Sequence, residues 1–259
     1  MTITYQQWGL HRGQAVYLFQ LVHQNGGRVQ LTNYGASIVS VQAPDRRGQA
    51  GEVVLGFASL EGFLQDRCYL GATIGRVANR IAGAQFSLDG IWYTLDANDG
   101  VHSNHSGPTG LHGKVFGFRV EDDALLFHTR CADGEGGFPG RLDVTVRYRW
   151  SADYRLEISY EAVTSRDTIV NITNHAYFNL SGARGAMLDH TLTIPACRLL
   201  EADSAYIPTG RLLPAGRKDF REATRISDKA GPGAYQVKGL NDYYLLDTPA
   251  PESRQELAL

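Results

Sequence analysis

A histidine set among amides and aromatic rings is the part of this sequence best suited to chemistry. His175 stands in the run Thr-Asn-His-Ala-Tyr-Phe-Asn-Leu-Ser-Gly at residues 173–182, at the end of a strand-like segment. An imidazole can give and take a proton near neutral pH, amides and hydroxyls can bind sugar hydroxyls, and aromatic faces can cover the apolar side of a pyranose. This mixture indicates acid–base chemistry on a sugar. The alternative is a histidine packed at a strand end with a satisfied hydrogen bond.

Three further segments carry polar side chains that could serve the same chemistry. They are residues 75–81 (Gly-Arg-Val-Ala-Asn-Arg-Ile), 110–113 (Gly-Leu-His-Gly) and 239–242 (Gly-Leu-Asn-Asp). Asn79 and Arg80 supply an amide and a guanidinium that can donate to sugar oxygens. His112 lies between Leu111 and Gly113, and the glycine lets the backbone approach a ligand closely. Asp242 can accept hydrogen bonds from two adjacent hydroxyls. A backbone-bonded loop histidine and an ordinary turn aspartate remain the alternatives for the last two.

Strand geometry limits which of these side chains can act together. In an extended segment Arg76 and Arg80 share one face and Asn79 lies on the other, so a bend must present one of the last two to a ligand. We assign Arg76 a structural role. Tyr177 and Phe178 also face opposite ways if extended, which predicts that they divide between the pocket and the core, with Tyr177 binding the substrate.

The four segments occur in the order and approximate spacing found in aldose 1-epimerases, and the chain resembles this family from about Asn33 to its end. The resemblance implies a large antiparallel β-sandwich of the galactose mutarotase type. It also implies interconversion of the α and β anomers of aldohexoses such as glucose and galactose, without a metal, nucleotide or redox cofactor. By the resemblance, His175 protonates the ring oxygen and His112 is a second catalytic imidazole near it. The implied sugar-binding residues are Asn79, Arg80, Tyr177 and Asp242.

The sequence departs from the family at the general base. In the family, a glutamate on a strand after the aspartate motif takes the O1 proton, whereas this sequence ends at Leu259, shortly after Asp242. We give that role to neither Glu252 nor Glu256. The expectation is a chain that is C-terminally incomplete relative to the family and weakly active. A sugar-binding protein without catalysis and an epimerase of phosphorylated hexoses are the alternatives, and the latter would need an arginine cluster near the pocket.

The loop around His112 departs from the family as well. Lys114 stands where a second glycine usually follows the histidine, and residues 102–109 look like an insertion. We expect His102 and His105, which lie in this stretch, to face solvent.

Strands must position these residues, because the hydrophobic periodicity is that of strands almost throughout. The predicted hairpins pair residues 16–21 with 29–31, 86–88 with 91–93, and 142–150 with 156–160. Turn residues such as Asn-Gly-Gly and Asp-Gly join them. Short helices are predicted only at residues 59–64 and 221–229. The long polar loops at residues 97–113 and 132–140 are places where function is often found. The sequence therefore predicts one all-β domain over residues 1–259, an antiparallel sandwich with little helix.

Composition and charge exclude other classes of function. The 259 residues are 43% hydrophobic and 20% charged, and the net charge of −2 comes without the basic run that a nucleic-acid partner would require. The sequence contains neither an apolar run of membrane-spanning length nor a secretion signal at its start. We expect a cytoplasmic monomer or homodimer whose partner is a monosaccharide substrate. Cys68, Cys131 and Cys197, an odd number without metal-type spacing, predict free thiols that are buried or half-buried.

Overall fold

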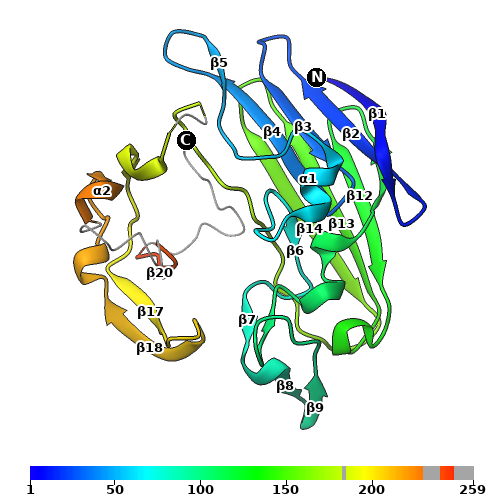
Figure 1. Ribbon diagram of the computed structural model, residues 1–259, viewed down its shortest axis with the longest axis vertical. Helices are drawn as coiled ribbons and strands as arrows, with labels where there is room; N and C mark the ends of the chain where they lie inside the picture. The colour runs from blue at the N-terminus through cyan, green and yellow to red at the C-terminus, as the bar shows by residue number, and fades with distance from the viewer. Residues whose placement is uncertain (183–184, 230–239, 248–259) are drawn as a thin grey trace. The chain divides into compact units, whose positions relative to one another are not determined.

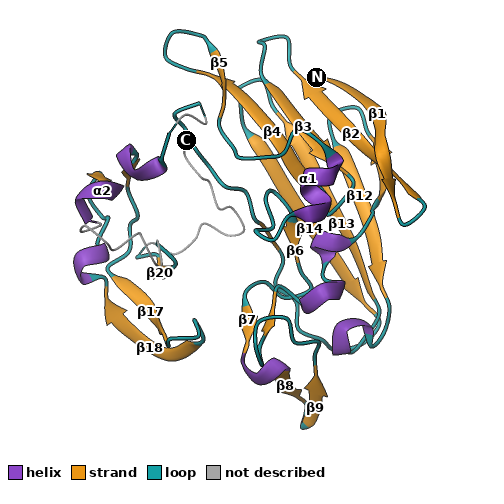
Figure 2. Ribbon diagram, viewed as in Figure 1, coloured by secondary structure: helices purple, strands orange, loops and turns teal. Residues whose placement is uncertain are grey.

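The computed structural model describes residues 1–182, 185–229 and 240–247 (Figure 1). Its contacts group into two compact units, Met1–Arg184 and Gly185–Leu259, and each is described by itself. Strands dominate the regular structure and the described helices are short (Figure 2), so the all-β prediction is confirmed. The prediction of a single domain over the whole chain stays a prediction.

Two antiparallel sheets make up most of the first unit. One sheet consists of β1 (Thr2–His11), β2 (Gln14–Val22), β3 (Arg28–Thr32), β4 (Ser37–Pro44) and β5 (Ala50–Glu52), in chain order. The other consists of β11 (Gly117–Val120), β12 (Leu125–Cys131), β13 (Leu142–Trp150) and β14 (Leu156–Thr164), also in chain order. Neighbouring strands follow one another in sequence, so each sheet is built from hairpins. The pairs β2–β3 and β13–β14 confirm two of the three predicted hairpins.

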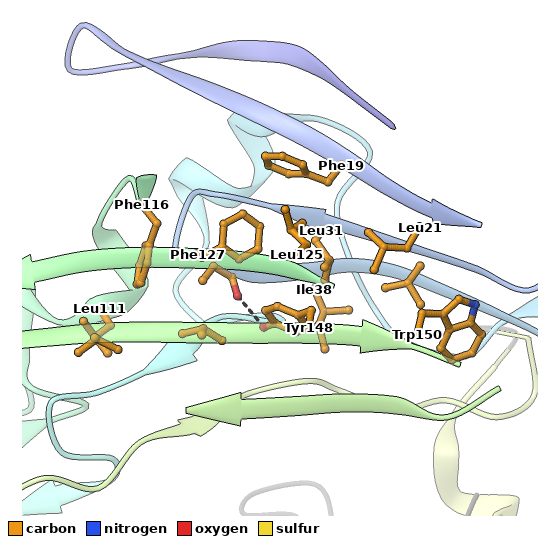
Figure 3. Close-up of a cluster of buried hydrophobic side chains, with 14 of the residues drawn as sticks. Phe19, Leu21, Leu31, Ile38, Leu111, Phe116, Leu125, Phe127, Tyr148 and Trp150 are labelled. Atoms are coloured by element: carbon orange, nitrogen blue, oxygen red, sulfur yellow. Dashed lines mark hydrogen bonds between the residues drawn. The ribbon is translucent and has the colours of Figure 1, made fainter. Parts of the chain in front are cut away.

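The alternation along β13 places the core between these sheets. The inward side chains are at most 2% exposed, namely those of Leu142, Val144, Val146, Tyr148 and Trp150. They form one cluster with Phe19 and Leu31 of the other sheet (Figure 3). Burying each large apolar side chain contributes about 1.5–3 kcal/mol to stability. The Tyr148 hydroxyl is satisfied inside this core, because it donates to the Ala36 carbonyl oxygen over 2.7 Å.

Short strand pairs and 3-10 turns of the first unit carry or adjoin most of the candidate residues. The pairs are β6 (Thr73–Ile74) with β15 (Thr173–Asn174), β7 (Arg80–Ile81) with β10 (Ser103–Asn104), and β8 (Gln85–Leu88) with β9 (Ile91–Thr94). The 3-10 turns are Ala82–Ala84, Gly107–Thr109, Leu111–Gly113 and Glu135–Gly137. The β8–β9 pair is the third predicted hairpin. The predicted helix at residues 59–64 is α1 (Leu60–Gln65), and the Ser59 hydroxyl oxygen caps it by accepting from the Gly62 N–H.

The second unit contains smaller sheets. Its elements are the pair β16 (Thr191–Leu192) and β19 (Thr224–Arg225), the sheet of β18 (Pro208–Pro214), β17 (Arg198–Ala202) and β20 (Tyr243–Leu245), the 3-10 turns Met187–Asp189 and Gly216–Lys218, and helix α2 (Ile226–Lys229). The helix predicted over residues 221–229 is therefore confirmed only in its last turn, because Thr224 and Arg225 pair as a strand instead. Asp242 directly precedes β20, at the strand entrance where it was predicted.

The three cysteines are free, as predicted. Cys131 is buried and Cys197 is half-buried, but the prediction was wrong for Cys68, which is exposed. The reason is its place in a surface turn after α1, where its backbone N–H donates to the Asp66 carboxylate over 2.8 Å. Among the described residues, the helices are all too short or too polar to cross a membrane.

Candidate active site

The backbone of His175 is fixed where the chain leaves β15. Its N–H donates to the Ala72 carbonyl oxygen (2.9 Å), and its own carbonyl oxygen accepts from the Gly71 N–H (3.0 Å). The preceding Asn174 amide donates to the Gly71 carbonyl oxygen (2.8 Å) and accepts from the Ala176 N–H (2.9 Å). The half-buried imidazole is therefore presented from a rigid support.

Three imidazoles gather around the ring of Tyr69. Its centroid lies 4.7 Å from that of His105, 4.8 Å from that of His112 and 5.9 Å from that of His175. The rings of His105 and His175 also contact each other directly, 5.3 Å apart and perpendicular. We call His105, His112 and His175 the histidine cluster. The structure thus brings the two predicted catalytic histidines into one site and adds a third.

His105 is a candidate functional residue that the sequence did not reveal. It is half-buried, so the prediction that it faces solvent was wrong. Its Nδ1 accepts from the Asn79 N–H (3.0 Å), and its own N–H donates to the Asn79 carbonyl oxygen (3.1 Å). His102 is half-buried too, with its Nδ1 accepting from the Gly83 N–H (3.1 Å). The available signal was the run His-Ser-Gly-Pro-Thr-Gly at residues 105–110, which has the same histidine-and-glycine character as the segment at His112.

The hydrogen bond to Asn79 sets the chemistry of His105. Because Nδ1 is an acceptor, the neutral imidazole carries its proton on Nε2. Burial, reinforced by the nearby imidazoles of His175 and His112, lowers the pKa of His105 to about 4. His105 is therefore neutral at pH 7 and can donate an Nε2–H hydrogen bond without being ionised.

The other imidazoles of the cluster are shifted in the same direction. Burial lowers the pKa of His112 to about 4, and its Nδ1 is buried without a hydrogen-bond partner among the described residues. Burial also lowers the pKa of His175, against the opposing effects of a bond to its own carbonyl oxygen and of the Asp66 carboxylate. All three imidazoles are thus mainly neutral at pH 7, and His175 becomes a stronger acid when protonated.

Gly110 makes room for two of these histidines. A Cβ at this position would lie 2.5 Å from the His105 carbonyl oxygen and 2.7 Å from Nδ1 of His112. Any larger residue would therefore displace one of them. Lys114, the departure from the family pattern after His112, forms an ion pair with Glu135.

The bend predicted between Arg76 and Arg80 occurs at Asn79. This residue has a φ of +65°, a left-handed conformation that asparagine tolerates better than most residues. The bend turns Arg80 toward Asp99, and Nε lies 2.7 Å from the carboxylate oxygen. The Asn79 side-chain oxygen accepts from the Arg80 N–H (2.9 Å). Asn79 and Arg80 therefore border the segment of His105, and their role in sugar binding stays a prediction.

Arg76 has the structural role assigned to it. It is 3% exposed, and its guanidinium donates to the carbonyl oxygens of Pro139 and Gly140, both over 2.8 Å. The same group lies 5.5 Å from the ring centroid of Phe138. Its donors are thus directed at the loop of residues 132–140 and away from the histidine cluster.

Tyr177 lies beside His175, with ring centroids 5.2 Å apart. Its hydroxyl donates to the Cys68 carbonyl oxygen over 3.1 Å. The predicted division between pocket and core was wrong for Phe178, which is 47% exposed. At this point the chain has left the sandwich, and Phe178 makes only an isolated bridge with Val54. Tyr177 therefore lies beside His175 and its role in substrate binding stays a prediction, while its neighbour does not join the core.

Asp242 belongs to the second unit. Its side chain is 15% exposed, and one carboxylate oxygen is 2.6 Å from Nζ of Lys218. The other oxygen is buried without a partner among the described residues, so it has capacity to accept a hydrogen bond. The placement of Asp242 in the pocket of His175 stays a prediction. Gly239, Glu252 and Glu256 lie outside the described residues.

The lowered pKa values predict a loss of stability in mild acid. An unfolded histidine takes up a proton near pH 6.5, whereas His105 and His112 in the folded chain resist protonation down to about pH 4. Between these values the unfolded state binds more protons, so stability is full above pH 6.5 and falls as the pH drops toward 4. With allowance for solvent screening, we expect each histidine to cost about 1 kcal/mol between pH 7 and pH 5. Urea unfolding at the two pH values measures this, and His112→Gln should reduce the difference. An equal difference in both proteins would contradict it.

The chain is similar to proteins of one known family. The family model described as aldose 1-epimerase matches residues 17–258. The chain is 43% identical to galactose mutarotase of Bos taurus over 186 residues and 38% identical to aldose 1-epimerase of Escherichia coli over 239 residues. The crystal structure of galactose 1-epimerase from Lactobacillus acidophilus superposes with a TM-score of 0.84 at 27% identity, over 96% of this chain and 75% of that one.

The matches differ in how much of each relative they cover. The bovine match takes in 71% of this chain and 54% of the bovine protein, and the bacterial match takes in 90% and 69%. The chain thus spans about half the length of the bovine relative. Within the described residues, no group of three or more histidine, cysteine, aspartate or glutamate side chains is arranged to hold a metal ion.

Proposed function

The chain belongs to the aldose 1-epimerase family, and from this premise we propose that it interconverts the α and β anomers of an aldohexose such as glucose or galactose. The observation that carries the proposal is the contact between His105 and His175. Separate segments bring these imidazoles to 5.3 Å from each other, where both can reach one small substrate.

The reaction opens and recloses the sugar ring. The O1 proton leaves to a base, the C1–O5 bond breaks, and O5 takes a proton; rotation about C1–C2 and the reverse steps then give the other anomer. We propose that protonated His175 supplies the proton to O5 and recovers it when the ring closes. Its lowered pKa makes the protonated imidazole a stronger acid for this step than an ordinary histidine. We assign no described residue to the base.

His105 is proposed to donate its Nε2–H to the sugar at or near the ring oxygen. Such a donor stabilises negative charge that develops as the C1–O5 bond breaks. We propose that His112 is the second catalytic imidazole, a neutral group packed on Tyr69 beside this pair. The proposed sugar-binding residues remain Asn79, Arg80, Tyr177 and Asp242. No cofactor enters these steps.

We propose a neutral hexose as the substrate in preference to the phosphorylated-hexose alternative. That function would need several guanidinium groups at the pocket to bind a phosphate. Arg76 is committed to carbonyl oxygens, and Arg80 is paired with Asp99. The neutral hexose is therefore the better substrate class.

Polarimetry tests the proposed function. Freshly dissolved α-D-glucose and α-D-galactose should approach their equilibrium rotations faster with the protein than in buffer, in proportion to protein concentration. Calorimetric titration with each sugar measures binding separately. Sugar binding without any acceleration would make the chain a binding protein, and the absence of both would reject the proposal.

A further inference from the structure

We propose that Tyr69 is a positioning residue, which sets the spacing and orientation of His105 and His175 for proton transfer. This inference rests on the proposed function for its effect on rate. Its structural part concerns the imidazoles alone and can be tested without turnover.

The ring of Tyr69 is the common neighbour of the histidine cluster. His105 follows β10, His112 lies in the 3-10 turn Leu111–Gly113, and His175 follows β15, so the three imidazoles come from separate segments. The Tyr69 ring meets His105 and His112 edge to face, at interplanar angles of 71° and 87°. A rigid aromatic ring in contact with all three fixes distances that no single backbone element fixes.

The backbone of Tyr69 has an unfavourable conformation. Its φ is +60°, which is rare for a bulky residue and persists only where the surroundings impose it. The Asp66 carboxylate imposes it here by accepting from the N–H groups of Cys68 (2.8 Å) and Leu70 (2.6 Å), on either side of Tyr69. The Tyr69 carbonyl oxygen also accepts from the Ala72 N–H (3.1 Å). The turn is thus closed around the residue whose ring enters the site.

The hydroxyl of Tyr69 reaches the segment that carries His105. The Asn98 side chain lies close enough to this hydroxyl to lower its pKa, against the larger effect of burial. The same Asn98 amide accepts from the Asn104 N–H (2.7 Å) and donates to the Asn104 carbonyl oxygen (2.9 Å). Since Asn104 precedes His105, Tyr69 acts on this histidine both through its ring and through Asn98. Burial raises the pKa of Tyr69, so its hydroxyl stays protonated at neutral pH and serves as a hydrogen-bonding group.

Two substitutions separate the ring from the hydroxyl. Tyr69→Leu removes both, whereas Tyr69→Phe keeps the ring contacts and loses only the hydroxyl beside Asn98. In Tyr69→Leu we expect kcat to fall about 10²-fold, the effect of a misplacement of about 1 Å, while KM stays within about threefold of the wild-type value. Tyr69→Phe should recover most of that loss.

Tyr154 provides a matched control. It is also half-buried, has a φ of +61°, packs its ring on Trp150 and donates its hydroxyl to the Asn25 carbonyl oxygen over 3.0 Å. None of its ring contacts involves the histidine cluster within the described chain. Tyr154→Leu therefore repeats the loss of a strained tyrosine and should leave kcat unchanged.

Histidine titration by NMR provides the readout that needs no turnover. In Tyr69→Leu, the pKa of His105 should rise toward 6.5, because water enters the space left by the ring, and that of His175 should move with it. In Tyr154→Leu both should match the wild type. The proposal is overturned if Tyr69→Leu leaves the two titrations unchanged. It is also overturned if the wild type is active and Tyr69→Leu shifts the titrations but keeps the wild-type rate. If the wild type does not accelerate mutarotation, the proposed function fails and the titrations alone decide the structural part.

Discussion

Replacing His175 by asparagine should lower the rate of anomer interconversion by about 10²–10⁴-fold, the range expected when a positioned acid is lost. Asparagine keeps a polar group of similar reach at this position, and the backbone bonds to Gly71 and Ala72 do not depend on the side chain. Sugar affinity should therefore stay within about threefold of the wild-type value, so that kcat falls while binding is preserved. Polarimetry measures the rate, and calorimetric titration measures affinity.

The control for this substitution is His128→Asn. His128 is exposed on β12 and should have no effect on rate. A parallel loss of affinity and rate in His175→Asn would make His175 a binding or structural group. Unchanged rate and affinity would show that the assignment of the acid is wrong.

The sandwich could be predicted from the sequence because the patterns that specify its strands and turns lie within short stretches of the chain. Alternation of apolar and polar residues along residues 142–150 specified which side chains enter the core, and all of the inward ones are buried. Turn residues specified the hairpins. The helix predicted over residues 221–229 failed in its first half, where pairing of β19 with β16, more than thirty residues away in sequence, prevails over local propensity.

The position of His105 could not be predicted in the same way. It depends on the pairing of Asn104 with Arg80 across β10 and β7, which are two residues long and show no alternation. It also depends on left-handed backbone at Asn79, His105 and Ser106, with φ values of +65°, +54° and +68°. Histidine and serine give no sign of such a conformation in a sequence, whereas glycine would. Irregular backbone of this kind is concentrated at functional sites, which is where pattern-based prediction is weakest.

Core and site meet at Tyr148. The alternation along residues 142–150 predicted that Tyr148 is a core residue, and its side chain is buried. Its hydroxyl also lies 3.3 Å from the Asn174 amide nitrogen. Asn174 in turn fixes the backbone around His175. The buried hydroxyl is therefore a polar link from the sandwich core to the strand end that presents the acid.

The second large effect is expected at His105, where two substitutions each keep one half of the imidazole. Asparagine places an acceptor near the position of Nδ1 and can keep the bond from the Asn79 N–H, but it lacks a donor at the position of Nε2. Glutamine places an amide N–H near Nε2 and gives up the bond to Asn79. If the Nε2–H stabilises charge at the sugar, His105→Asn should lose about 10²–10³-fold in kcat/KM, as for other single donors to a developing anion.

His105→Gln should be the milder change, with a loss of about tenfold from a donor that is present but less well positioned. The order of the two variants is the decisive measurement, because both shorten or reshape the same side chain and both leave the Asn79 carbonyl bond to the residue 105 N–H in place. A greater loss in the glutamine variant would mean that His105 acts by holding Asn79 and that the acceptor Nδ1 matters more than the donor. Wild-type rates in the asparagine variant would show that His105 takes no part in the reaction. The 5.3 Å contact between the rings of His105 and His175 would then have no catalytic role.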